Sequence, residues 1–157
     1  MTGVNSYSGA TATGTAGGVV YSNDVAPATS GFTGAGSVTV EPATFNFSAA
    51  YSVNHSFANT LTGLTIGKTG NLTPVTLNTA IAMAGPVTVT APSVTVNQAI
   101  DSGSTLRING RAVLNGGTIT TAGTQYFNGA VHLDSDQVLS SGGDVTLVGK
   151  VNNQTAG

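Results

Sequence analysis

The sequence predicts an all-β protein whose chain winds as a right-handed parallel β-helix, or β-solenoid, with roughly 19–20 residues in each coil. Three observations predict this fold. Gly110, Gly129 and Gly149 stand 19 and 20 residues apart. The residues around them repeat with the same period, and the repeats consist of short triplets in which apolar residues alternate with Thr or other polar residues. Such alternation is typical of a strand with one face in a core.

Rows of the repeat place apolar residues in shared columns. The rows begin at Pro86, Thr105, Thr124 and Asp144. Val, Ile and Thr fit the pleated surface of a strand well, so each triplet is expected to turn its apolar side chains inward. The predicted columns place Val87 and Val89 over Leu106 and Ile108, then over Phe127, and then over Val145 and Leu147.

Asn-Gly pairs separate these triplets and predict corners of the coil, because both residue types tolerate positive φ. The pairs at 109–110 and 128–129 recur one period apart, which favours stacked corners over isolated hairpins. Like side chains at stacked corners can form ladders from coil to coil. The predicted structural corner residues are Asn109, Gly110, Asn128, Gly129 and Gly149.

The period continues upstream with looser spacing. Residues 64–85 read as a coil that is longer by about four residues, with a bulging loop at 68–74. Residues 38–40 and 45–47 form two more alternating triplets, and Tyr51, Val53 and Phe57 continue the apolar set. Residues 1–33 are expected to form an irregular N-terminal coil or cap, and 34–157 one continuous solenoid. The final row stops part-way through a coil, which suggests a fragment of a longer protein.

Composition excludes several classes of function. Only 6% of the residues are charged, against about 25% in an average protein. Four Lys and Arg residues are too few for a nucleic-acid-binding stripe. No apolar run is long enough for a membrane span, so neither nucleic-acid binding nor membrane insertion is expected. There is no cysteine, and no cofactor is predicted.

Two stretches carry a resemblance to a known family. Residues 63–71 with 84–89, and residues 122–131 with 143–147, are similar to the repeats of filamentous-haemagglutinin-like exoproteins, which include large adhesins and autotransporter passengers of Gram-negative bacteria. The resemblance implies a parallel β-helix secreted to the bacterial cell surface or beyond, with the export signal outside this chain. It also implies a structural rod segment of an adhesin or extracellular matrix fibre that supports attachment or biofilm cohesion.

Candidate ligand-contact residues are few, and no catalytic residue is predicted, so the chain is not expected to be an enzyme. His132, Asp134 and Asp136 alternate along one predicted strand face, as a metal or acid/base group would, but a polar edge running into a turn explains them equally simply. Tyr126, flanked by Gln125 and Asn128, could stack on a sugar. A carbohydrate-binding module is therefore the main alternative function.

Ice binding and polysaccharide degradation are weaker alternatives. A row of Thr for ice is broken, because Arg107 and Tyr126 occupy the positions equivalent to Thr88. The ten charged residues are scattered along the chain, where an enzyme cleft would gather several. The expected partners are a second copy of the chain through end-to-end self-association and a host or matrix glycan or protein.

Overall fold

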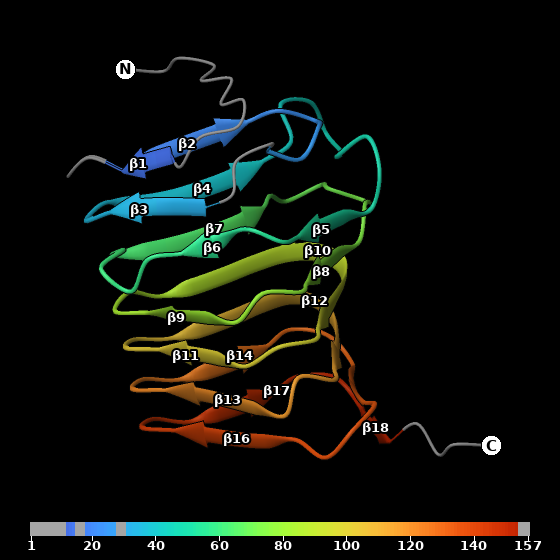
Figure 1. Cartoon of the computed structure of the whole chain (residues 1–157). Helices are drawn as coiled ribbons and strands as arrows, with labels where there is room; N and C mark the ends of the chain where they lie inside the picture. The colour runs from blue at the N-terminus through green and yellow to red at the C-terminus, as the bar shows by residue number, and fades with distance from the viewer. Residues whose placement is uncertain (1–11, 15–17, 28–30, 154–157) are drawn as a thin grey trace.

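The computed structural model describes residues 12–14, 18–27 and 31–153. These residues contain no helix; they form parallel strands stacked as a β-solenoid of about seven turns. Figure 1 shows the coils stacked from the blue N-terminal strands to the red C-terminal ones. The predicted fold class is therefore confirmed. Because no described helix exists, none is long and apolar enough to cross a membrane.

Three faces of the coil each form a parallel ladder. The first face contains β2 (Val19–Ser22), β4 (Ser37–Glu41), β7 (Gly63–Gly67), β10 (Val87–Val96), β12 (Leu106–Leu114), β14 (Gln125–Phe127) and β17 (Val145–Leu147). The second contains β5 (Tyr51–Val53), β8 (Val75–Leu77), the later halves of β10 and β12, β15 (Val131–Leu133) and β18 (Val151–Asn153). The third contains β9 (Ile81–Met83), β11 (Ile100–Ser102), β13 (Thr118–Thr121) and β16 (Val138–Ser141). The short strands β1 (Ala12–Gly14), β3 (Gly31–Gly34) and β6 (Ser56–Phe57) form a separate ladder.

The register of the first ladder agrees with the predicted rows. Val89 pairs with Ile108, and Phe127 pairs with Ile108 and with Leu147. All of these except Leu147, which lies in the last coil, are fully buried. The residues between them point outward and form the column Thr88, Arg107, Tyr126 and Thr146. One backbone register therefore determines both the core and the surface of this face.

The upstream coils are longer than the 19-residue coils that follow. Val87 pairs with Leu64, 23 residues earlier, and the extra residues lie in the loop 68–74 between β7 and β8, as predicted. The preceding coil is longer still, with hydrogen bonds that join residues 26 apart, such as Thr73 Oγ1 to the carbonyl of Phe47 at 2.9 Å. The described part of residues 1–33 pairs with later strands, through β1 with β3 and β2 with β4.

Two local predictions were wrong. Residues 45–47 are not a strand; they belong to the connection between β4 and β5, in which the Phe45 side chain is 77% exposed and Phe47 is buried. The corner at Asn109 and Gly110 is a bend inside the continuous strand β12. In β10 the register shifts between Thr90 and Ser93, so that the bend is a β-bulge opposite β12.

Aromatic side chains thicken the core beside the long coils. The rings of Phe32 and Phe57 stack with centroids 5.6 Å apart, and those of Phe47 and Tyr51 lie 4.7 Å apart. All four are buried. Aromatic side chains fill more volume than the Val and Ile columns, so they suit coils with a larger perimeter.

The stacked glycine corner depends mainly on close approach between coils. Gly110 has φ +140°, whereas Gly129 and Gly149 do not have positive φ, so the predicted reason for glycine is wrong at these two positions. A Cβ at Gly129 would meet the carbonyl of Gly110 and lie 2.8 Å from the backbone nitrogen of Arg111. The backbone of the preceding coil leaves no room for any side chain there.

Replacing Gly129 with Ala should therefore destabilise the protein, although the same change is harmless elsewhere. We expect Gly129→Ala to cost about 1–3 kcal/mol by overpacking, which lowers the melting temperature by about 2–4 °C per kcal/mol. Gly63→Ala is the matched control, because the nearest atoms to its Cβ would be 3.7 Å away. Thermal denaturation followed by circular dichroism compares the two, and equal melting temperatures would contradict the stacked corner.

The Tyr51 hydroxyl should make the fold sensitive to alkali. Its oxygen is buried and has no hydrogen-bond partner in the described structure. Burial raises the Tyr51 pKa well above the usual value, and nearby Tyr21 adds to the increase. The unfolded chain then ionises first, near pH 10, so stability should fall as pH rises above about 10. Tyr51→Phe should be as stable as the wild type or more stable at pH 7, and should lose less stability between pH 10 and 12. Urea denaturation across this pH range measures both, and an unchanged alkaline slope would refute the assignment.

Candidate functional site

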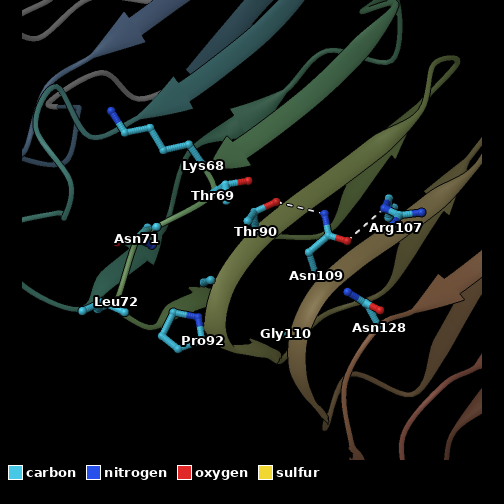
Figure 2. A pocket seen from close by; sticks show the side chains of 12 residues that line it. Lys68, Thr69, Asn71, Leu72, Thr90, Pro92, Arg107, Asn109, Gly110 and Asn128 are labelled. Carbon is cyan, nitrogen blue, oxygen red and sulfur yellow. Dashed lines mark hydrogen bonds between the residues drawn. The ribbon is translucent and has the colours of Figure 1, made fainter.

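A groove of about 590 Å³ crosses three coils on the corner where β10 and β12 bend (Figure 2). The loop 68–72 forms one wall, the bends of the two strands form its floor, and Asn128 after β14 lies at the far end. Its lining residues are Lys68, Thr69, Gly70, Asn71, Leu72, Thr90, Ala91, Pro92, Arg107, Asn109, Gly110 and Asn128.

The groove exists because coil lengths differ. The loop 68–74 carries the extra residues of its coil, and the 19-residue coils after it have no counterpart. Asn71 holds the loop in shape: its side chain donates to the carbonyl of Thr73 at 2.9 Å and accepts from the backbone nitrogen of Thr73 at 3.1 Å. The backbone nitrogen of Leu72 also donates to Asn46 Oδ1 at 2.6 Å, which ties the loop to the preceding coil. The wall of the groove is therefore anchored at both levels.

Arg107 is the best-defined cation in the groove. Its guanidinium carbon lies 4.3 Å from the centroid of the Tyr126 ring, a cation–π distance. Its Nε donates to Asn109 Oδ1 at 2.9 Å, and Asn109 Nδ2 donates to Thr90 Oγ1 at 3.1 Å. The two terminal nitrogens of Arg107 have no hydrogen-bond partner in the described part of the chain. A ring and an amide thus hold the side chain, and its outer nitrogens stay available.

Lys68 plays a different part. Its ammonium donates to the carbonyl of Pro42 at 2.6 Å, and in Figure 2 the side chain extends away from the groove. It also contributes to the low pKa of the exposed Asp24 carboxyl, which is held down first by hydrogen bonds from the backbone and hydroxyl of Thr44. No acidic residue lines the groove. Arg107 is therefore the cation in the groove that can meet a ligand.

The predicted corner residues are divided between this groove and the corner beneath it. Asn109, Gly110 and Asn128 line the groove, and Gly129 and Gly149 stack below Gly110 at the same corner. Tyr126, a predicted ligand contact, lies under Arg107 and is half-buried.

Gln125 is a correction to the predicted sugar contact. Its side chain is fully buried, and Nε2 donates to the carbonyls of Ile119 and Ser140 at 3.2 and 2.8 Å. It therefore cannot meet a surface ligand beside Tyr126. The sequence-based search did not select Arg107, although the predicted rows already placed it directly over Tyr126.

His132, Asp134 and Asp136 do not share a strand face. β15 ends at Leu133, so both Asp residues lie beyond it, exposed on the way to β16. His132 is half-buried in β15 and pairs with Val113 and Asn152. Within the described ranges, no three His, Cys, Asp or Glu side chains are grouped as metal ligands would be. The polar-edge interpretation fits this arrangement better than a metal or acid/base group.

An asparagine ladder runs along a second corner of the solenoid. Asn78 donates to Asn54 at 3.2 Å, Asn97 to Asn78 at 2.8 Å, and Asn115 to Asn97 at 3.4 Å, in each case from Nδ2 to Oδ1. A ladder was predicted at the Asn109 and Asn128 corner, but there Asn109 bonds to Thr90 and Arg107 instead. The ladder therefore stabilises one corner, and the other corner is left to form the groove.

Comparisons with protein families, with curated proteins and with solved structures found no match to this chain.

Removing Asn97 should weaken the solenoid, because it is an interior member of the ladder and makes two of its hydrogen bonds. We expect Asn97→Ala to lose about 1–2 kcal/mol, since a typical hydrogen bond contributes about 0.5–1.5 kcal/mol. Asn59→Ala is a suitable control: Asn59 is exposed and its side chain makes no hydrogen bond in the described structure. Urea denaturation of both variants measures the difference. A loss no larger in Asn97→Ala than in Asn59→Ala would show that the ladder adds nothing to stability.

Proposed function

We propose that this chain is a rod segment of an extracellular or cell-surface fibre of the adhesin type, which supports attachment or cohesion. The observation that carries the proposal is the unbroken stack of about seven turns, which ends in an unpaired and apolar coil. The resemblance to adhesin repeats supports the same proposal. Secretion is part of it and agrees with a chain that has no cysteine and few charges.

Rod stiffness follows from the direction of the hydrogen bonds. Every coil is bonded to the next along the axis, with neighbouring strands about 4.8 Å apart. The core is continuous from Val38 to Val131, so no hinge between separate cores interrupts it. Bending the axis would require opening these ladders. A repeat stack of this kind is a suitable spacer between a surface and a binding tip.

The last coil has the properties of a docking surface for a second copy of the chain. β16, β17 and β18 each pair with a strand on one side only. These three strands contain no Lys, Arg, Asp, Glu or Pro, the residues that commonly protect an edge strand from pairing. Large apolar side chains on this coil are 38–57% exposed, namely Val138, Val145, Leu147, Val148 and Val151.

The second copy is the favoured occupant because the edge repeats the chemistry of the ladder beneath it. Val145 and Leu147 continue the columns of Gln125 and Phe127, and Val151 continues that of Val131. A further β edge with apolar columns is the surface that satisfies both the backbone groups and the side chains. Another copy of this chain supplies such an edge at its own last coil or at its first.

Charge placed on the last coil should abolish this association. We expect the mass of the wild-type chain, measured by light scattering after size exclusion, to rise with concentration. The double variant Val138→Lys with Val145→Lys should stay monomeric, because its edge would carry two lysines. Phe45→Lys is the matched control, since Phe45 is 77% exposed but lies away from the end coil.

Electron microscopy of the same samples distinguishes the mode of association. Closed dimers would mean that two last coils pair with each other, and filaments would mean that the last coil pairs with the first coil of the next copy. Both would support self-association. A wild-type chain that stays monomeric at all concentrations, or association that survives the two lysines, would overturn it.

The groove favours a second function, carbohydrate binding, which does not depend on the end coil.

A further inference from the structure

We infer that the groove beside Arg107 is a binding site for an oligosaccharide that carries a carboxylate, such as a uronic acid chain. The inference goes beyond the proposed rod function, because it rests on the corner of β10 and β12 and on the loop 68–72. A chain that never self-associates could still bind such a sugar. The two proposals can therefore fail separately.

Arg107 is arranged to receive a carboxylate. One face of its guanidinium packs on Tyr126, and its Nε is bonded to Asn109 at 2.9 Å. The two terminal nitrogens are left as a planar fork, the geometry that binds a carboxylate through two parallel hydrogen bonds. Because the side chain is already held in place, less conformational entropy is lost when a ligand binds.

The remaining lining is suited to a sugar ring. Asn128 and Thr69 offer amide and hydroxyl groups that can bond to sugar hydroxyls. Leu72 is 74% exposed and Pro92 is also exposed, so apolar surface is available for the C–H faces of a ring. The volume of about 590 Å³ lies within the range of small-molecule sites. The groove is open and crosses three coils, as a site for an extended chain would.

The charge of the groove favours one carboxylate over a densely sulfated chain. Lys68, the other cation in the lining, donates its ammonium to Pro42 and extends away from the groove. The lining contains no third cation and no acid. A polysulfated ligand would need several available cations to balance its charge. With no carboxyl to serve as general acid, the groove is also arranged for binding and not for glycoside cleavage.

The test is calorimetric titration of the purified full chain with a trimer of galacturonic acid and with the same trimer methyl-esterified. We expect the acid form to bind and the ester, which lacks the charge, to bind roughly 10- to 100-fold more weakly. Arg107→Gln should lose affinity by a similar factor. Arg107→Lys should also lose affinity, because lysine keeps the charge but has no planar fork. Arg111→Gln, which removes a nearby exposed cation that does not line the groove, should bind like the wild type.

Three results would overturn the inference: no binding of the acid trimer at millimolar concentration, equal losses in Arg107→Gln and Arg111→Gln, or tighter binding of a sulfated oligosaccharide of equal length. Circular dichroism checks that each variant is folded. If the Arg107 variants do not fold, NMR of the wild type still decides the matter. The side-chain amides of Asn109 and Asn128 should shift on adding the acid trimer, and a lack of shifts there would contradict the site.

Discussion

The parallel pairing of each coil with the next is the constraint on which the rest of this structure depends. Ladder hydrogen bonds align residue with residue, so Val89, Ile108 and Phe127 stack in one buried column. The residues beside them are placed outward by the same alignment, which puts Arg107 directly over Tyr126. Because side chains alternate along a strand, a slip by one residue would exchange core and surface on the whole face. The packing, the ladder of Asn side chains and the groove are all consequences of one register.

Within this constraint the chain varies only where strands are absent or bent. The extra residues of the long coils lie in connections such as 68–74, and the strands on either side of it keep their pairing. The corner at Gly110 has room for no side chain, since a Cβ there would meet the carbonyl of Ala91. A projecting loop beside a corner without a side chain leaves a hollow. The groove is therefore produced by a change in coil length, and the core does not have to be altered to make it.

The two proposed roles use different parts of the same rod. Self-association would use backbone edges and apolar side chains of the last coil, where β16–β18 contain no charge. Sugar binding would use a side corner two coils away, where Arg107 is held by Tyr126 and Asn109. In a chain with only 6% charged residues, a single oriented guanidinium contributes most of the local field. A rod that presents such a site along its side could bind a matrix glycan while its end is engaged.

The sequence alone determined the fold class, the coil length after residue 86 and the column pairing, because a solenoid repeats the same contacts at a fixed spacing that can be read along the chain. It also contained the signal for Gln125, which stands in the inward column of Leu106, and for Arg107, which stands over Tyr126. Other features arose only from contacts between coils. The exposure of Phe45, the crowding at Gly129 and the choice of the Asn54–Asn115 corner for the ladder depend on distances between segments that local alternation does not encode. The orientation of Arg107 needed tertiary structure most of all, because its ring and its amide come from different coils and the groove above them from a third.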